Sequence, residues 1–250
     1  GGEPITCLAA YTYPLAKIID RHCDVILVGD SLGMTIYGMK DTLSVSVDMM
    51  INHGKAVTRA REKSFVVVDM PFGSYESSKE KAFETSYNII SNTGCDAVKL
   101  ECNESTIDTV KFLVDRGIPV MGHIGLLPQH YNKYGGYKSQ GRDEEQARSL
   151  IELASNIEKS GSFCIVIEGV VESVSKKITE SINIPTIGIG ASNACDGQVL
   201  VVDDMLGIDD GNKSKFVKKY TNLHSQIDKS VQDYTKEVSS RQFPSKDNTY

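Results

Sequence analysis

The chain has 250 residues, of which 40% are hydrophobic, and 33 acidic residues outnumber 27 basic ones to give a net charge of −6. This length provides a core large enough for one α/β barrel or for two smaller domains. The net negative charge argues against nucleic acid as a partner, since no basic stripe is present to neutralise phosphates. No apolar run approaches the roughly 20 residues that a membrane-spanning helix needs, and we expect no signal peptide.

Short apolar runs alternate with longer amphipathic segments along the chain. The apolar runs predict eight strands: Ile5–Ala10, Asp24–Gly29, Phe65–Asp69, Ala97–Glu101, Pro119–Ile124, Phe163–Glu168, Thr186–Gly190 and Gln198–Val202. The amphipathic segments predict seven helices: Pro14–Arg21, Val47–Lys63, Ser78–Asn92, Ser105–Arg116, Glu144–Ser160, Ser173–Ser181 and Lys215–Val238. Nearly continuous apolar strands joined by helices are typical of a parallel α/β fold, and eight of them favour a (β/α)8 TIM barrel over an open doubly wound sheet.

The spacing of these segments also predicts the domain organisation. Only Ser192–Gly197 separates the last two strands, so the helix between them should be absent or very short. We expect residues 1–238 to form a single barrel domain and residues 239–250 to be a frayed polar tail. The long segment Leu126–Arg142 holds three tyrosines among glycines and is predicted to be a binding loop or a lid.

Six cysteines are spread along the chain without any Cys-x-x-Cys pair. They are Cys7, Cys23, Cys95, Cys102, Cys164 and Cys195. Several lie in or beside apolar runs, so we expect packed free thiols rather than disulfides or a metal cluster. Free thiols suit a reducing compartment, and we therefore expect the protein to be cytoplasmic.

Charged side chains end several predicted strands, at the end where a parallel barrel places its active site. Lys99 and Glu101 stand two residues apart, so they point to the same face of the fourth strand. Asp30 and Asp69 end the second and third strands, which makes them neighbours of Glu101 in a barrel. For any one of these residues, a capping role or a salt bridge at the rim is as good an explanation as chemistry. The set as a whole predicts an active site.

The chemistry of this set favours a metal-assisted reaction. Three clustered carboxylates repel one another unless they are protonated or neutralised by a cation. Because oxygen ligands without Cys or His suit Mg2+, we predict that Asp30, Asp69 and Glu101 hold this ion. The ammonium group of Lys99 suits a substrate carboxylate or a developing enolate oxygen. Glu168, two strands beyond, could remove a proton from carbon.

Six blocks of sequence carry a family resemblance. They are Val28–Met34, Val68–Tyr75, Asp96–Glu101, Ile118–Leu126, Gly135–Arg142 and Ile184–Ala191. In this order, and with little insertion between about Ile5 and Ile208, they resemble the signature blocks of the ketopantoate hydroxymethyltransferase family. The resemblance implies a barrel of the phosphoenolpyruvate/pyruvate-binding group and a homo-oligomer such as a decamer.

The same resemblance implies a reaction. This family moves a one-carbon unit from 5,10-methylenetetrahydrofolate to 3-methyl-2-oxobutanoate, through a Mg2+-stabilised enolate, and makes 2-dehydropantoate for pantothenate synthesis. By position, the residues that match the family's metal carboxylates are Asp30, Asp69 and Glu101. Those expected to bind the substrate are Asp30, Ser31, Asp69 and Lys99, and Glu168 matches the proton acceptor. The sequence departs from the family pattern at Gly169, where a cysteine is usual, and at Ala191–Ala194.

Two other functions are compatible with a barrel of this kind. A carbon–carbon lyase or phosphonomutase of the same group would use Mg2+ and an enolate on another oxo acid. Such enzymes more often carry a cysteine or an acid on a mobile lid, unlike the tyrosine- and glycine-rich Leu126–Arg142 segment. A non-catalytic binding barrel would be expected to lose the charges at its strand ends, and those charges are present here.

Overall fold

The computed structural model describes residues 2–130, 139–209, 211 and 214–250. Eight parallel strands form a closed barrel in sequence order, and β8 pairs with β1 to close it. The strands are β1 (Ile5–Ala9), β2 (Val25–Val28), β3 (Phe65–Asp69), β4 (Ala97–Glu101), β5 (Val120–Gly125), β6 (Cys164–Glu168), β7 (Thr186–Ile189) and β8 (Gly197–Val201). Each lies within two residues of its predicted bounds, and the (β/α)8 TIM barrel is confirmed.

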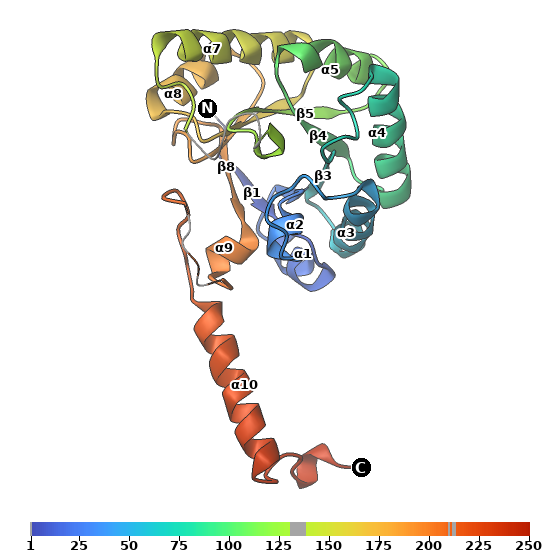
Figure 1. The fold of residues 1–250 in the computed structure, drawn as a ribbon, viewed down its shortest axis with the longest axis vertical. Coiled ribbons are helices and arrows are strands. Elements are labelled where there is room, and N and C mark those ends of the chain that lie inside the picture. The colour runs from blue at the N-terminus through green and yellow to red at the C-terminus, as the bar shows by residue number, and fades with distance from the viewer. Residues whose placement is uncertain (1, 131–138, 210, 212–213) are drawn as a thin grey trace. The chain divides into compact units, whose positions relative to one another are not determined.

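Helices connect most of the strands and lie outside them, as α4, α5, α7 and α8 do in Figure 1. The α-helices before β8 are α1 (Tyr13–Ile19), α2 (Leu32–Thr35), α3 (Val47–Ala60), α4 (Lys79–Thr93), α5 (Ile107–Val114), α7 (Glu144–Lys159) and α8 (Glu172–Ser181). Among the described residues before β8, the 3-10 turns are η1 (Glu104–Thr106) and η2 (Pro128–His130). No helix separates β7 from β8 in the fully described segment 190–196, as the sequence predicted.

The predicted helix starts are close to the observed ones because polar side chains cap them. Ser46 before α3, Ser78 before α4 and Asp143 before α7 each accept a hydrogen bond from a backbone N–H group three residues later. Such caps satisfy one of the N–H groups that the first turn leaves without a partner. The single turn of α2 has no side-chain cap hydrogen bond and was not predicted.

The chain divides into two compact units, Gly1–Val201 and Val202–Tyr250. The second unit contains α9 (Val202–Leu206), α10 (Leu223–Ser239) and η3 (Lys246–Asn248). The division falls after Val201, whereas the sequence placed a domain boundary after residue 238, and that boundary stays a prediction. None of the described helices is both long enough and apolar enough to cross a membrane.

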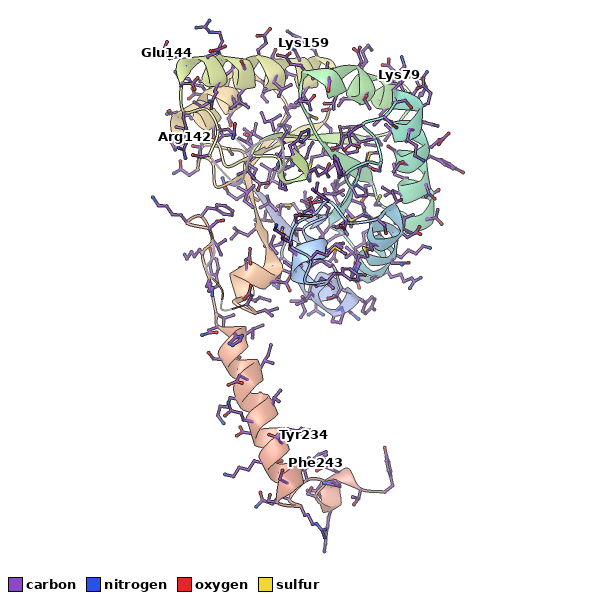
Figure 2. All side chains as sticks on the ribbon, viewed as in Figure 1. Lys79, Arg142, Glu144, Lys159, Tyr234 and Phe243 are labelled. Atoms are coloured by element: carbon purple, nitrogen blue, oxygen red, sulfur yellow. The ribbon has the colours of Figure 1, made fainter. Side chains whose placement is uncertain are left out.

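The last long helix begins later than predicted. The sequence predicted a helix from Lys215, but α10 starts at Leu223 because the Asn222 side chain accepts a hydrogen bond from the N–H group of Ser225 and caps it there. No residue of α10 is buried. Near its end, the Tyr234 ring packs edge-on against Phe243 with 5.6 Å between centroids (Figure 2).

The buried core contains the cysteines as well as the aliphatic side chains of the strands. All six cysteines are free and buried, which confirms the prediction of packed thiols. Burial raises the pKa of Cys164 to about 12 and that of Cys102 to about 11. These thiols are therefore protonated at neutral pH and act as small apolar groups.

Carboxylates at the amino ends of the strands hold backbone groups in place. Asp24, before β2, accepts a hydrogen bond from the N–H group of Thr6 on β1 at 2.8 Å. Asp96, before β4, accepts one from Val66 on β3 at 2.8 Å. The buried carboxylate of Asp20 accepts three, from the loop between α3 and β3. These acids satisfy strand and loop N–H groups at the end of the barrel away from the predicted site.

We predict that Asp20→Asn makes the protein less stable and changes how its stability depends on pH. Burial alone would raise the pKa of Asp20, but the N–H groups of Ser64, Glu62 and Lys63 lower it from 3.8 to about 2. A pKa that is lower in the folded state stabilises the protein above about pH 4, and this stabilisation is lost as pH falls toward 2. The substitution should cost about 2 kcal/mol at pH 7. Urea unfolding at several pH values measures both effects.

The matched control is Asp108→Asn, which changes an exposed acid in the first turn of α5. We expect its unfolding free energy to follow the wild type at every pH. If Asp20→Asn and the wild type lost stability in parallel between pH 4 and pH 2.5, the three hydrogen bonds would not be the source of the pH dependence.

Candidate active site

The centre of the candidate site is the buried cation Lys99 on β4. Its neighbour in the sheet register is Asp69 on β3, and the Lys99 Nζ atom lies 3.1 Å from Asp69 Oδ1. On the other side, Nζ lies 3.2 Å from Nδ1 of His123 on β5. Burial alone lowers the pKa of Lys99, but the charges of Asp69, Asp30 and Glu101 more than offset this and raise it to about 12. Lys99 is therefore charged although it is buried.

The next strand extends this row of polar groups. The Nε2 atom of His123 lies 3.1 Å from Oε2 of Glu168 on β6, although it makes no hydrogen bond within the described residues. The Glu168 side chain is 19% exposed, while that of His123 is only 3% exposed. If Lys99 donates to Nδ1, a neutral His123 ring carries its proton on Nε2, facing Glu168. Four consecutive strands thus present a continuous line of groups that can hold or move protons.

Asp30 lies two residues after the end of β2 and contacts Asp69. Asp69 therefore has Lys99 at one of its oxygens and Asp30 at the other. Its backbone N–H group donates to Asp69 Oδ2 at 3.0 Å, and both side chains are buried. Burial and the neighbouring charge of Asp69 raise the pKa of Asp30 well above its ordinary value. A Cβ atom at Gly29 would lie 2.9 Å from Ser31 Oγ, so a larger residue at this position would displace the Ser31 hydroxyl. The Ser31 hydroxyl also hydrogen bonds to the hydroxyl of Tyr11 at 2.6 Å.

Gln129, in η2 after β5, inserts between the carboxylates. Its side-chain Nε2 donates to Asp30 Oδ2 at 2.8 Å, and its backbone N–H donates to Glu101 Oε1 at 3.0 Å. Its Oε1 atom accepts a 2.6 Å hydrogen bond from the hydroxyl of Tyr75. The same η2 turn brings His130 Nδ1 to 3.1 Å from Glu101 Oε2. Glu101 therefore uses its oxygens to hold the η2 turn.

The predicted metal site is only partly assembled. Among the described residues, no group of three or more His, Cys, Asp or Glu side chains is arranged to hold a metal ion. Asp30 and Asp69 lie together, but Gln129 separates Asp30 from Glu101. The assignment of all three carboxylates as ligands stays a prediction.

The first pair of carboxylates nevertheless fits a hard cation. The Asp69 Oδ1 atom is buried and forms an ion pair with Lys99 at 3.1 Å, without a hydrogen bond of regular geometry in the part of the chain that the structure describes. Burial raises the pKa of Asp30, and the like charge of Asp69 raises it further, so a bound cation would favour the charged form of this carboxyl group. Both residues offer oxygen atoms, which is the donor chemistry that Mg2+ prefers.

Sequence reasoning missed the residues that surround the carboxylates. Gln129, Tyr75 and His130 lie in loops after strands, and no periodic pattern places a loop side chain. The position of Pro128–His130 directly after β5 was the available signal. Of the predicted Leu126–Arg142 loop, residues 131–138 lie outside the described residues, as does the first half of the Gly135–Arg142 block.

The departure from the family pattern at Gly169 has a local structural setting. This residue follows Glu168 directly and adopts a left-handed conformation with φ of 58°. Its N–H group donates to the carbonyl of Ile189, and its own carbonyl accepts from Gln140. Glycine adopts such a φ at no steric cost, whereas a cysteine would be strained there.

Comparison with known proteins supports a catalytic barrel. The family model described as ketopantoate hydroxymethyltransferase matches residues 1–246. A protein of Rhizobium etli named 3-methyl-2-oxobutanoate hydroxymethyltransferase is 54% identical over 250 residues, covering 100% of this chain and 92% of the relative. A protein of the same name from Anaplasma marginale is 52% identical and covers 100% of this chain and 90% of its own length.

Solved structures with the same fold are much more distant in sequence. A putative phosphonomutase from Burkholderia cenocepacia superposes with a TM-score of 0.64 at 12% identity, covering 94% of this chain and 93% of the other. A 2,3-dimethylmalate lyase of the PEP mutase/isocitrate lyase superfamily gives a TM-score of 0.58 at 12% identity, covering 97% and 93%. These similarities show the barrel architecture alone. Since the family model covers nearly the whole sequence and full-length relatives are more than half identical, the chain belongs to the ketopantoate hydroxymethyltransferase family.

Proposed function

We propose that this protein transfers a hydroxymethyl group from 5,10-methylenetetrahydrofolate to 3-methyl-2-oxobutanoate, giving 2-dehydropantoate and tetrahydrofolate. The observation that carries the proposal is the line Asp69, Lys99, His123 and Glu168, which runs across the ends of four consecutive strands with contacts of 3.1–3.2 Å. This line places an acidic cluster and a cation at one end and a partly exposed base at the other.

The keto acid binds at the cationic end of this line. Lys99 supplies a buried positive charge for the carboxylate or the keto oxygen, and the Ser31 hydroxyl supplies a hydrogen bond. Asp30 and Asp69, with Glu101 behind the η2 turn, are the residues that would hold Mg2+. When bound there, the ion supplies Lewis-acid stabilisation of negative charge on the keto oxygen.

Glu168 is the proposed base. Its carboxylate takes the proton from carbon 3 of the keto acid, and the electron pair of that C–H bond becomes the enolate. The His123 ring lies between Glu168 and Lys99, so it can hold Glu168 in position. Carbon 3 then bonds to the methylene carbon of the donor. Both carbon–nitrogen bonds of that methylene group break in the reaction. One donor nitrogen receives the proton that Glu168 took from carbon 3, and water supplies the hydroxyl group of the product and a proton to the other nitrogen.

We propose a cytoplasmic location and assembly as a homo-oligomer such as a decamer. The location is supported by six free cysteines, which suit a reducing compartment. The assembly rests on family resemblance. We propose no nucleic-acid or membrane partner.

Activity should require a divalent cation, and Asp69→Asn should bind that cation more weakly while the fold stays intact. The amide keeps the shape of the carboxylate but lacks its charge. Titration calorimetry with Mg2+ measures the affinity directly, and circular dichroism checks the fold. Asp108→Asn is the control, because it removes a distant acid. Full turnover in excess EDTA, with the metal content confirmed to be nil, would contradict the prediction.

Lys99→Ala should lower kcat/KM by roughly 10- to 1000-fold, which corresponds to about 1.4–4 kcal/mol of lost transition-state binding. The variant should also lose stability, because Asp69 is left buried without its cation. Lys99→Met, which restores the buried volume but not the charge, separates packing from electrostatics. We expect both variants to be impaired per folded molecule. If a variant unfolds more easily but keeps wild-type kinetics, Lys99 contributes to stability through its ion pair and has no role in catalysis.

Exchange of the carbon-3 hydrogen of 3-methyl-2-oxobutanoate with solvent deuterium should proceed without folate and should need both Mg2+ and Glu168. Glu168→Gln keeps the shape but accepts no proton, so the exchange rate should fall by roughly 100-fold or more. Binding of the keto acid should change little. Proton NMR follows the exchange, and Glu180→Gln on α8 is the control. Exchange at the wild-type rate in Glu168→Gln would remove Glu168 from the mechanism and make His123 the next residue to test.

A further inference from the structure

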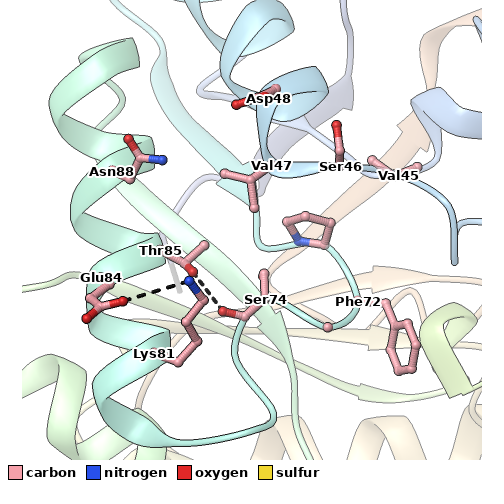
Figure 3. A pocket seen from close by; sticks show the side chains of 12 residues that line it. Val45, Ser46, Val47, Asp48, Phe72, Ser74, Lys81, Glu84, Thr85 and Asn88 are labelled. Atoms are coloured by element: carbon pink, nitrogen blue, oxygen red, sulfur yellow. Dashed lines mark hydrogen bonds and ion pairs between the residues drawn. The ribbon is translucent and has the colours of Figure 1, made fainter.

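A cavity borders the loop that follows β3, the strand that carries Asp69. It has a volume of about 460 Å³ and lies between the first turns of α3, the helix α4 and the loop that follows β3 (Figure 3). Its wall includes Pro71, which follows Asp69 by two residues. Two residues span at most about 7 Å, so this wall begins close to the carboxylates of the site. None of the groups described in the mechanism uses this cavity.

Ser74, one of the residues that line the cavity, carries a buried hydroxyl group that lacks a partner among the described residues. Ser74 is 5% exposed, and its Oγ atom has no hydrogen-bond partner within the described residues. The backbone of Ser74 is fixed, because its carbonyl accepts a 2.8 Å hydrogen bond from the Thr85 hydroxyl on α4. A buried polar group without a partner costs free energy, and a polar ligand in the cavity would remove that cost.

The charges around the cavity favour a ligand that donates hydrogen bonds. Figure 3 shows Asp48 on α3 across the cavity from Glu84 and Asn88 on α4. Lys81 is the lysine of this wall, and its Nζ atom already lies 3.8 Å from Glu84. Asp48 has no cationic partner among the described residues. The wall thus carries two carboxylates against one ammonium group, which disfavours a dianionic ligand.

The shape of the wall adds an aromatic surface. Phe72 is 45% exposed and borders the cavity on the loop after β3. A flat ring system packs well against such a side chain. The cavity therefore suits a planar, neutral heterocyclic ligand. Amino groups of such a ligand would donate hydrogen bonds to Asp48, and a carbonyl oxygen of the ligand would accept one from Asn88 or Lys81.

We propose that this cavity binds the pterin ring of the folate donor, an inference that rests on the proposed function. The amino group and ring N–H of the pterin donate to Asp48, while its carbonyl oxygen accepts from Asn88 and a ring nitrogen or N–H pairs with the Ser74 hydroxyl. The methylene carbon next to the ring then faces the end of β3, where the keto acid binds. The glutamate tail of the donor, which is dianionic, points out of the cavity.

Binding measurements test this assignment with two fragments of the donor. Tetrahydrofolate and 6-methyltetrahydropterin should both bind the wild type in the presence of Mg2+ and 3-methyl-2-oxobutanoate, as measured by titration calorimetry. Asp48→Asn should weaken both by roughly 10- to 100-fold, the effect of losing a charge-assisted hydrogen bond. Ser74→Ala should weaken both by less. Any binding of p-aminobenzoylglutamate should be the same in Asp48→Asn as in the wild type.

Asp108→Asn is the matched control, since it also removes an acid from the first turn of a helix. The folate-independent deuterium exchange of the keto acid, measured on the same samples, reports whether the keto-acid site is intact. Wild-type affinity for 6-methyltetrahydropterin in Asp48→Asn, with tetrahydrofolate still bound, would overturn the cavity assignment and leave the proposed function standing. Weaker p-aminobenzoylglutamate binding in Asp48→Asn, with the pterin unaffected, would also overturn it. Failure of the wild type to bind tetrahydrofolate at all would overturn both.

Discussion

The site depends on one buried positive charge. Removing an ammonium group from water costs several kcal/mol unless charged partners compensate for it. The partners of Lys99 come from the neighbouring strands, with Asp69 on β3 at 3.1 Å and His123 on β5 at 3.2 Å. Because these strands are hydrogen-bonded to β4, the distances between the three groups are set by the sheet rather than by loops. The barrel thus holds a charged row that would be unstable on a more flexible scaffold.

The two ends of the barrel use acidic residues in opposite ways. At the amino ends of the strands, Asp20, Asp24 and Asp96 each accept backbone N–H groups and are satisfied by them. At the carboxyl ends, Asp30 and Asp69 lie against each other, and the other oxygen of Asp69 is paired with the buried ammonium group of Lys99 rather than with backbone N–H groups. Satisfied acids stabilise a fold, whereas crowded ones store electrostatic energy that a ligand can release.

The positions of the strand ends could be predicted from the sequence, but the paths of the loops and the contacts of their side chains could not. The apolar runs located every strand, and the two-residue alternation placed Lys99 and Glu101 on one face. The insertion of Gln129 between Asp30 and Glu101 depends on the path of the η2 turn, which no periodicity encodes. For the same reason the sequence alone predicted that Asp30, Asp69 and Glu101 would cluster as neighbours. The capping of α10 by Asn222 was also missed, because propensity alone favoured a longer helix.

The buried thiols determine how the unfolding of this protein can be observed. The chain has no tryptophan, so its intrinsic fluorescence offers little contrast between folded and unfolded states. All six cysteines are shielded in the folded protein, and two have a pKa of about 11 or higher. Thiol reagents attack the exposed thiolate, so native molecules should be spared and unfolded ones labelled at every cysteine. The amount of maleimide dye that reacts with the protein therefore measures the fraction of unfolded molecules, and no engineered label is needed.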